Sequence, residues 1–529
     1  MTFVITQNCC ADASCVPVCP VDCIRPAPQS TDSPAQSLYI DPDSCVDCGA
    51  CQEVCPVDAI YYEDELPANQ EAFRGINANY FKLHPLTIRE FGFRPAKESV
   101  TPGSLRVAVV GAGPAACYAV SALARIAGAE INVFERLPSP FGLVRYGVAP
   151  DHQRTKGVVD TLQAGLSSPN VQCYFNVEVG RDITHDELVA RHHAVIYAVG
   201  ASDGRSLDIP GEDLDGCHTA ADVVAWYNGH PDRINEDIDL SGSRAVIVGN
   251  GNVALDVARI LTMDIDALSR TDIADPALVR LAGSAVDEVV ILGRRGIADA
   301  AFSIGEFLAL RELDGVDVVI EGELGNRPQE GTESALKYEV AQELRNTPLT
   351  PGNKRIVMRF FTSPVRLIGE DRVSGVHVTG DEVIPTSLVI RAIGYRGREV
   401  AGVPFDVDRG ILPNNSGRIV GSDGEPRAGL YATGWIKRGP SGVIGTNRTC
   451  AEDTVAQVVA DHLAGVLPAP SSNAAVATLL AERGVRVVNW SDWQAIDRAE
   501  KVNGAASSRP RVKFIERQQF LAAASAISV

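Results

Sequence analysis

The sequence predicts an α/β protein in which two doubly wound units follow a small α+β module rich in cysteine. Two segments with the pattern strand, glycine turn, helix begin at residues 106 and 244 and predict the two units. Nine of the 13 cysteines lie in the first 66 residues and predict the module. A length of 529 residues corresponds to three or four domains of about 150 residues each.

Composition excludes several classes of protein. Apolar residues make up 45% and charged residues 22%, which excludes disorder, collagen-like repeats and simple coiled coil. The longest apolar stretch, 107–120, is shorter than the roughly 20 residues that span a bilayer, so we expect no transmembrane helix. The first residues lack the features of a signal peptide, so we expect a cytoplasmic protein. The absence of basic excess argues against nucleic acid or anionic membrane as a partner.

The clearest motif is a run of four cysteines that ends in Cys-Pro. Cys45, Cys48, Cys51 and Cys55 are separated by two, two and three residues, and Pro56 follows. An iron-sulfur cubane needs four converging thiolates, and such a run supplies three of them while its fourth cysteine reaches a neighbouring cluster. In a reducing compartment cluster ligation is favoured over disulfides.

An earlier run repeats this spacing with one change. Cys9, Asp12, Cys15 and Cys19 are again separated by two, two and three residues, and Pro20 follows. The carboxylate of Asp12 is a harder and weaker ligand for iron than a thiolate. Two structural zinc sites are the alternative, because cysteine pairs two residues apart also bind zinc. The two Cys-Pro ends favour iron-sulfur clusters.

Residues 1–66 resemble the bacterial two-cluster ferredoxins, including the Pro-Val-Asp that follows a cysteine in each half. The resemblance implies a complete [4Fe-4S] cluster held by Cys19, Cys45, Cys48 and Cys51. It implies a second cluster held by Cys9, Cys15 and Cys55, expected as [3Fe-4S], or as [4Fe-4S] if Asp12 or Cys10 takes the fourth iron. Whether Cys9 or Cys10 is the ligand stays open, and Cys23 would be an unligated cysteine beside a cluster.

The first glycine turn follows a stretch, 67–104, that shows no periodicity and is expected to be a linker. A strand at 106–110 leads into a turn and a helix, and the turn contains Gly111, Gly113, Pro114 and Ala115. The glycines let the backbone approach a pyrophosphate at the helix N-terminus, and Glu135 ends the next strand, where a carboxylate binds a ribose hydroxyl. A tight strand-helix connection is the alternative; the whole pattern favours a nucleotide such as FAD.

The second glycine turn has a different charge beside it. The strand at 244–248 is followed by Gly249, Asn250, Gly251, Asn252 and Val253. The next strand, 288–292, ends in Gly-Arg-Arg-Gly, so that Arg294 and Arg295 replace the acidic residue. Guanidinium groups bind a 2′-phosphate that a carboxylate would repel, which predicts NADP as the second nucleotide. Two surface arginines on a turn are the alternative.

Two similar apolar segments, 194–201 and 388–397, bracket the second unit and predict that it is inserted in the first. The expected domains are a ferredoxin domain at 1–66, an FAD-binding domain at 105–202, an NADP-binding domain at 203–390, and the second part of the FAD domain with a C-terminal extension at 391–529. After the return, a strand that ends in Gly434 and a glycine-rich turn at 438–445 precede a helix. Its N-terminus can stabilise negative charge on a reduced flavin.

Residues 105 onward resemble the adrenodoxin-reductase type of NADPH-ferredoxin reductase, and the whole chain is similar to bacterial forms with a fused ferredoxin. The resemblance rests on 141–152, 248–258, 293–296 and 435–445. It implies two Rossmann-like domains, with the NADP domain inserted in the FAD domain. By this resemblance the flavin would be contacted by Leu143, Val144, Gly434, Trp435, Gly442, Val443 and Ile444. Asn252 and Val253 would meet the NADP pyrophosphate, and Glu306 would approach the adenosine ribose.

The same resemblance places Asp151 and His152 at the active site, with His152 as the catalytic candidate. Relatives often continue after the position of Glu306 with Leu-Arg-Glu, whereas this chain has Phe307, Leu308 and Ala309. This departure argues against a His-Glu couple, so that His152 would act alone or cap a helix. Hydride transfer between nicotinamide and flavin depends on their alignment rather than on an acid or base.

The expected reaction takes a hydride from NADPH to FAD and then single electrons to the clusters. An external ferredoxin or another acceptor such as a monooxygenase would then take the electrons from the clusters. Eight Asp and three Glu against Arg25 alone make residues 1–66 acidic, which predicts docking on a basic surface that includes Lys437, Arg438 or Arg396. The alternatives are an NADPH-input subunit of a larger complex, similar to the small subunit of glutamate synthase, and an iron-sulfur redox sensor.

Overall fold

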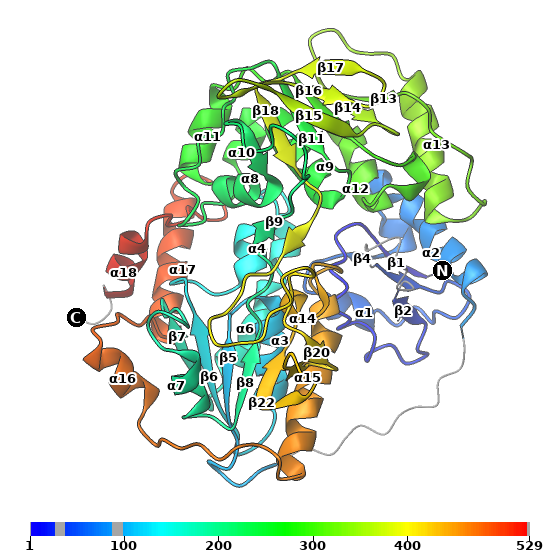
Figure 1. The fold of residues 1–529 in the computed structure, drawn as a ribbon. Coiled ribbons are helices and arrows are strands. Elements are labelled where there is room, and N and C mark those ends of the chain that lie inside the picture. Colours follow the sequence, from blue (N-terminus) through cyan, green and yellow to red (C-terminus); the bar gives the residue numbers. More distant parts are fainter. Residues whose placement is uncertain (1, 27–36, 87–98, 526–529) are drawn as a thin grey trace.

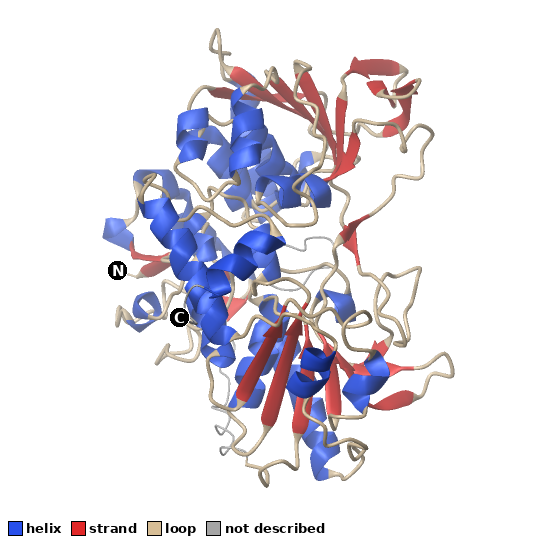
Figure 2. Cartoon of the chain, turned by 90° about the vertical axis from the view of Figure 1, so that its left-hand side faces the viewer, coloured by secondary structure: helices blue, strands red, loops and turns tan. Residues whose placement is uncertain are grey.

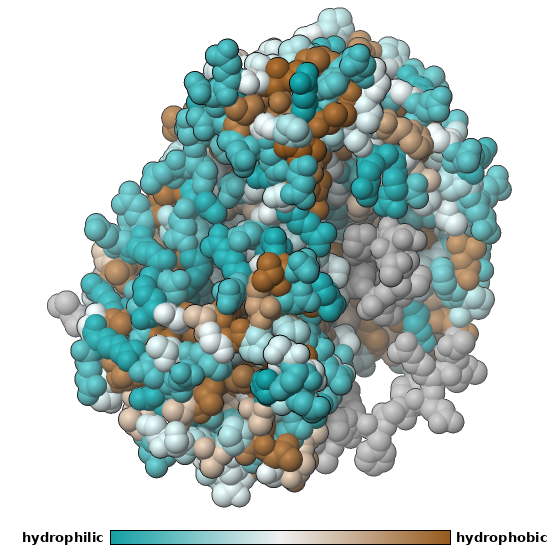
Figure 3. All heavy atoms as spheres, viewed as in Figure 1, coloured by the Kyte–Doolittle hydropathy of each residue, from teal (hydrophilic) through white to brown (hydrophobic). Residues whose placement is uncertain are grey.

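The computed structural model describes residues 2–26, 37–86 and 99–525. Two large sheets covered by helices lie one above the other, and the cysteine-rich module packs beside the junction between them (Figure 1). The predicted α/β class with two nucleotide-binding folds and an α+β module is confirmed. The face drawn in Figure 3 is mostly hydrophilic, with apolar side chains in scattered patches. No helix in the described ranges is long and apolar enough to cross a membrane.

The lower sheet has seven strands in the order β20-β21-β22-β8-β5-β6-β7. The strands from β22 to β7 are parallel, and the hairpin of β20 and β21 forms an antiparallel edge. Helices cover both faces, so the central strands are apolar along their length rather than alternating. The strand bounds are Arg106–Val110 (β5), Glu130–Glu135 (β6), Val171–Phe175 (β7), Ala194–Tyr197 (β8), Asn414–Asn415 (β20), Arg418–Val420 (β21) and Pro426–Ala432 (β22).

The helices of the lower unit come from distant parts of the chain. Helices α3, α6 and α15 pack on one face of the sheet, and α7 and α16 pack on the other. The bounds are Pro114–Ala124 (α3), Gly142–Tyr146 (α4), Gln153–Lys156 (α5), Val159–Leu166 (α6), His185–Val189 (α7), Trp435–Arg438 (α14), Thr446–Leu463 (α15), Val476–Glu482 (α16), Trp490–Ala505 (α17) and Arg517–Ser525 (α18).

The upper sheet is parallel throughout, in the order β10-β18-β11-β12-β14-β13. Helices cover one face (Figure 2), and a small antiparallel sheet of β15, β16 and β17 covers the other. The strand bounds are Cys217–Thr219 (β10), Arg244–Val248 (β11), Glu288–Leu292 (β12), Val316–Glu321 (β13), Lys354–Arg359 (β14), Pro364–Gly369 (β15), Val373–Val378 (β16), Glu382–Pro385 (β17) and Leu388–Arg391 (β18). The helices are Ala220–Tyr227 (α8), Asn252–Thr262 (α9), Ile265–Ser269 (α10), Asp275–Ala282 (α11), Ile304–Ala309 (α12) and Glu333–Asn346 (α13), with 3-10 turns at Ile297–Asp299 (η3) and Leu310–Glu312 (η4).

The chain leaves the lower sheet after β8 and rejoins it only at β20, so the upper unit lies between two parts of the lower one. The two crossings pair with each other as a short antiparallel ribbon of β9 (Asp203–Gly204) and β19 (Tyr395–Arg396). The two similar sequence segments prove to be equivalent strands: β8 pairs with β5, and β18 pairs in the same way with β11. The strand at 388–391 is therefore part of the inserted sheet itself.

The cysteine-rich module contains two short ribbons. β1 (Phe3–Ile5) pairs with β4 (Ile60–Tyr62), and β2 (Ile24–Pro26) pairs with β3 (Leu38–Ile40). The short helix α1 spans Ala50–Glu53, and a 3-10 turn, η1, spans Glu63–Glu65. Cysteine side chains and aliphatic residues share the small core between the ribbons. Each ribbon therefore pairs a strand that flanks the first cysteine run with a strand that flanks the second.

The stretch 67–104 was expected to be a linker, but part of it is a helix that belongs to the module. After the turn η2 (Ala68–Gln70), α2 spans Ala72–Leu83. The buried Asn77 side chain donates to the carbonyl oxygen of Ile5 and accepts from the amide of Ile40, both at 2.9 Å. Because this polar residue stands in the buried stripe between Phe73 and Phe81, the apolar periodicity is broken in the sequence. Residues 87–98 of the expected linker lie outside the described residues.

Candidate functional site

Both glycine turns have the same backbone geometry. Gly111 has a φ of +107°, and a Cβ built on it would lie 2.5 Å from the carbonyl oxygen of Ala198. Gly249 has a φ of +109°, and its Cβ would lie 2.4 Å from the carbonyl oxygen of Ala392. Each position therefore requires glycine for two reasons, an unusual dihedral angle and the close approach of the neighbouring strand.

The second glycine of each turn has a different reason to lack a side chain. Cβ atoms built on Gly113 and Gly251 would meet nothing within 4 Å. Both residues stand at the N-cap of a helix, α3 and α9, whose first amides point into this space. Open space at a helix N-terminus fits a pyrophosphate. We call each glycine turn with the helix N-terminus behind it a cradle, and the two cradles fit the two predicted dinucleotides.

The residue at the end of the next strand differs between the cradles, as the sequence predicts. Glu135 accepts hydrogen bonds from the amides of Ala112 at 2.9 Å and Leu137 at 3.0 Å, and burial raises its pKa. Arg294 and Arg295 are both exposed, and no ion-pair partner for either is found among the described residues. One cradle thus ends in a fixed carboxylate and the other in two free guanidinium groups.

Around the second turn, asparagines hold the neighbouring loop. The carbonyl oxygen of Asn250 accepts from the amide of Phe302 at 3.1 Å, and Asn252 Oδ1 accepts from the amide of Ser303 at 2.7 Å. Val253 packs against the upper core at the start of α9. These bonds bring the loop before α12 over the second cradle.

The residues expected around a flavin gather at the first cradle. A Cβ on Gly434 would lie 2.5 Å from Cβ of Ala115, so the end of β22 lies directly against the start of α3, where Pro114 is the first residue. Leu143, Val144 and Ile444 belong to one apolar cluster, and Gly442 and Val443 precede Ile444 in the adjoining turn. The buried Nε1 of Trp435 has no hydrogen-bond partner in the described structure, and its ring stacks on Tyr395. Such an unpartnered donor beside a glycine cradle fits a bound polar ring.

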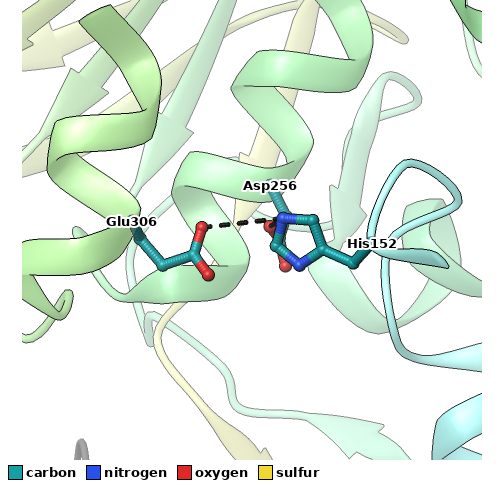
Figure 4. Close-up of side chains that lie close together, drawn as sticks. All are labelled: His152, Asp256 and Glu306. Atoms are coloured by element: carbon teal, nitrogen blue, oxygen red, sulfur yellow. Dashed lines mark ion pairs between the residues drawn. The ribbon is translucent and has the colours of Figure 1, made fainter. Parts of the chain in front are cut away.

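His152 lies in a compact polar group at the junction of the two units. Its Nε2 is 3.8 Å from a carboxylate oxygen of Glu306 and 4.0 Å from one of Asp256 (Figure 4). Glu306, on α12, is therefore a carboxylate beside His152, and Ala309 stands where relatives often have a further glutamate. That His152 acts without a glutamate at position 309 stays a prediction. His152 occupies the N-cap of α5, but its side chain makes no capping bond there.

Arg259 connects this group. Its guanidinium donates to Asp151, Asp256 and Glu306, and Nη2 lies 2.7 Å from His152 Nε2. Because a guanidinium only donates, Nε2 must accept here, which leaves the ring proton on Nδ1. Burial raises the pKa of Glu306, whereas Arg259 holds the pKa of Asp151 below its usual range despite burial. Glu306 therefore holds a proton more readily than Asp151 does.

The cysteines form two sets, each gathered from both halves of the module. One set lies close enough together for its side chains to interact electrostatically. It consists of Cys9, Cys15 and Cys55, with Asp12 and Cys10 beside them. A small cavity brings together the second set, Cys19, Cys45, Cys48 and Cys51, with Cys23 beside it. Burial raises the pKa of Cys9 to about 11 and that of Cys51 to about 12, and a bound metal would favour the thiolate form of both. Both sets fit iron-sulfur clusters with crossed ligation.

The fourth position of the first set has two candidates. Asp12 accepts hydrogen bonds from the amide and hydroxyl of Ser14, so its carboxylate is already bonded within the loop. Cys10 is buried, at 4% exposure, and burial raises its pKa well above the usual value.

Comparison with known proteins identifies the family. The family model for pyridine nucleotide-disulphide oxidoreductases matches residues 105–434, and that for the 4Fe-4S binding domain matches residues 38–61. A protein of Mycobacterium leprae, "Probable ferredoxin/ferredoxin-NADP reductase", is 44% identical over 99% of this chain and 98% of its own length. The chain belongs to the ferredoxin-NADP reductase family. The resemblance inferred from the motifs is confirmed.

Shorter relatives match only the reductase part. "NADPH-ferredoxin reductase FprA" of Mycobacterium tuberculosis is 42% identical over 78% of this chain and 98% of that protein. Human "NADPH:adrenodoxin oxidoreductase, mitochondrial" is 38% identical over 79% of this chain and 91% of that protein. The solved structure "Mycobacterium tuberculosis FprA in complex with NADPH" superposes with a TM-score of 0.74 at 40% identity, covering 79% of this chain and 99% of that one. This ferredoxin-NADP reductase therefore adds the cysteine module to a reductase of known fold.

Sequence reasoning missed two residues of this reductase's polar group, Asp256 and Arg259. Both stand on α9, three residues apart, in a helix whose other side chains are mostly apolar. A charged pair inside an apolar run, directly after a glycine turn, is the signal that could have found them, because such charges need partners when buried.

The expected docking of the acidic module on Lys437, Arg438 or Arg396 is not what the structure has. Those side chains bond within the reductase, to Thr454, to Ser441 and Asn447, and to Val407. Hydrogen bonds from Arg154, Gly445 and Arg448 join the module to the reductase instead. Among the described residues this interface contains no ion pair, so apolar contacts and these hydrogen bonds hold it together.

Proposed function

We propose that this chain is an NADPH-ferredoxin oxidoreductase that passes electrons through its own ferredoxin module to an external acceptor. The observation that carries the proposal is the combination of two nucleotide cradles of opposite charge with two cysteine sets in one packed chain. One cradle suits the adenosine ribose of FAD, and the other suits the 2′-phosphate of NADP. The external acceptor would be a separate ferredoxin or another one-electron protein such as a monooxygenase, in the cytoplasm.

The residues have separate tasks in this proposal. Gly111, Gly113 and Glu135 would hold FAD, and Gly251 with Arg294 and Arg295 would hold NADPH. Leu143, Val144, Gly434, Trp435 and the turn 442–444 would surround the flavin ring, and Asn250, Asn252 and Val253 would border the NADP pyrophosphate. When bound, FAD accepts a hydride and releases single electrons, which iron-sulfur clusters carry one at a time.

The polar group around His152 balances the charges at the junction of the two units and fixes the ring proton of His152. Arg259 neutralises Asp151 and Asp256, and Glu306 provides a carboxyl group that takes up a proton readily. His152 is thereby held in one tautomer, with its Nδ1–H as the donor. We propose that this residue positions the nicotinamide side of the site rather than moving a proton in the hydride step, which needs none.

For the clusters we propose one [4Fe-4S] on Cys19, Cys45, Cys48 and Cys51, and one [3Fe-4S] on Cys9, Cys15 and Cys55. The bonds from Ser14 to Asp12 support three irons, because they occupy the carboxylate that would hold a fourth. Iron and acid-labile sulfide measured anaerobically should give one iron fewer than sulfide. Equal amounts would overturn the [3Fe-4S] assignment and point to Asp12 or Cys10 as a ligand.

Anaerobic mixing with NADPH tests the function itself. The flavin absorption should bleach, and steady reduction of an added one-electron acceptor should follow. A protein whose flavin is not bleached by NADPH would contradict the proposal. Bleaching without any turnover on acceptors would favour a redox sensor.

A further inference from the structure

The loop that follows Cys9 contacts the turn at 442–445, which would border the flavin. The amide of Gly445 donates to the carbonyl oxygen of Cys10 at 2.9 Å, and Arg448 Nη1 donates to the carbonyl oxygen of Asp12 at 3.0 Å. A Cβ built on Gly445 would lie 1.8 Å from the carbonyl oxygen of Ala11. No side chain separates the cysteine loop from the turn at 442–445 at this point.

The segment after Cys55 makes the second contact with the reductase. A Cβ built on Gly157 would lie 2.9 Å from the carbonyl oxygen of Pro56. Cys10, Val57 and Ala59 are buried in the same apolar cluster as Val144 and Ile444, and Cys9 and Cys55 pack at its edge. The set Cys9, Cys15 and Cys55 therefore faces the proposed flavin site through a continuous apolar contact (Figure 1, where the module lies beside α14 and α15).

The other set lies away from this contact. Cys48 is exposed, and beside it Val46 is 56% exposed and Val21 is 40% exposed. All three residues line the small cavity that brings together the second set. The buried apolar cluster that joins the module to the reductase contains no member of this set.

We propose an order for the two sites: the Cys9, Cys15 and Cys55 site receives electrons from the flavin, and the Cys19, Cys45, Cys48 and Cys51 site delivers them to the external acceptor. The order deepens the proposed function and rests on it. One NADPH provides two electrons, and each passes singly, reducing the first cluster by one electron and then the second. An acceptor protein takes each electron from the second cluster, which returns to its oxidised form.

The physical reason is distance and exposure. Electron tunnelling weakens steeply with distance, and a site in direct contact with the flavin turn has the shorter path. An acceptor protein can approach only a site that the surface exposes, and Cys48 is the exposed cysteine among the proposed ligands. The first set has less access, since Cys15 is 5% exposed and Cys9 and Cys55 are half-buried at the edge of the cluster shared with the reductase.

Two ligand variants separate the sites. In Cys48→Ser, NADPH should still reduce the remaining cluster, seen by electron paramagnetic resonance after anaerobic freezing. In Cys55→Ser, the remaining cluster should stay oxidised with NADPH although dithionite reduces it. The reverse pattern would overturn the order. Flavin bleaching is recorded in the same samples, so that a failure of the proposed function itself is recognised separately.

A further variant keeps every cysteine, so that the order can be tested even if the cysteine variants fail to fold. Gly445→Ala inserts a methyl group against Ala11 at a φ of −68°, which alanine tolerates. Gly75→Ala in α2, where a Cβ meets nothing within 4 Å, is the matched control.

Because the added Cβ would lie 1.8 Å from the carbonyl oxygen of Ala11, where real Cβ atoms do not come closer than 3.0 Å, the module must shift away from the turn. Reduction of the first cluster by NADPH should then slow severalfold relative to flavin bleaching. The magnetic broadening of the one-electron-reduced flavin radical signal by the first cluster should weaken in Gly445→Ala and persist in the control. Unchanged cluster reduction and unchanged broadening in Gly445→Ala would contradict the inference.

Discussion

The guanidinium of Arg259 lies 2.7 Å from His152 Nε2, and it is the cation among three carboxylates. At 2% exposure Arg259 would be costly to bury alone, but the surrounding acids raise its pKa well above the usual value despite that burial. The arginine comes from α9 of the inserted unit, whereas His152 and Asp151 belong to the other. This contact therefore ties the two nucleotide-binding units together at the point where their ligands would meet.

Removal of that charge should be strongly destabilising. We expect Arg259→Leu to lower the free energy of unfolding by about 3 kcal/mol, because three half-buried carboxylates lose their buried counter-charge. Asp151 has a lowered folded-state pKa, so its share of stability is present above its unfolded pKa and is lost as the pH falls through the folded value. The loss in Arg259→Leu should accordingly shrink at acid pH. Denaturant titrations at two pH values measure this, and Arg259→Leu with Asp151→Asn should recover part of the loss.

A substitution at the phosphate cradles should affect ligands rather than folding. Gly113→Ala should weaken FAD binding, and Gly251→Ala should raise the KM for NADPH, because each methyl group enters open space at a helix N-terminus. Gly111→Ala is the contrasting variant, since its methyl group would meet the carbonyl oxygen of Ala198 at 2.5 Å and should destabilise the protein without ligand. Melting curves of the ligand-free proteins beside titrations with FAD separate the two effects. Equal melting losses for Gly113→Ala and Gly111→Ala would count against a nucleotide at the first cradle.

The arginine pair should determine the choice of cofactor. Arg294→Ala with Arg295→Ala should raise the KM for NADPH about 10- to 100-fold, because hydrogen bonds between charged groups contribute roughly 1.5–3 kcal/mol. The KM for NADH should hardly change. Arg427→Ala removes a surface guanidinium that pairs with Asp423 and serves as the control. Equal changes for both nucleotides would contradict the NADP assignment.

Part of the fall in the free energy of unfolding at acid pH should come from His192. This histidine is 1% exposed, its Nδ1 lies 2.8 Å from the carbonyl oxygen of Leu188, and its Nε2 lies 2.9 Å from Asn132 Nδ2. Burial lowers its pKa from 6.5 to about 4, so the unfolded chain binds the proton first and stability falls as the pH drops from 6.5 to 4. The loss is roughly 3 kcal/mol at most. Asn132→Asp supplies an acceptor for the protonated ring and should flatten the unfolding free energy in this window; an unchanged slope would argue against it.

Short-range patterns were sufficient for much of this fold and site. The spacing of glycines, the acidic or basic residue that ends the following strand, and the cysteine spacing all concern residues close in the chain, where backbone geometry sets what a residue type can do. The strand at 288–292 was predicted to the residue for that reason, and Glu135 ends β6 as expected. Crossed pairing of the cysteines followed from the family resemblance rather than from spacing.

Contacts between distant segments were beyond such patterns. Helix α2 has its polar Asn77 on the buried face, so only its partners on β1 and β3 explain it. The meeting of His152 with Arg259 and Glu306, and the position of the Cys9 loop on the turn before α15, depend on how whole units pack. The energy of packing comes from many weak contacts between residues that are far apart in the chain, so the pattern of one segment does not reveal it. The tertiary structure alone therefore decided which cysteine set faces the reductase and which faces solvent.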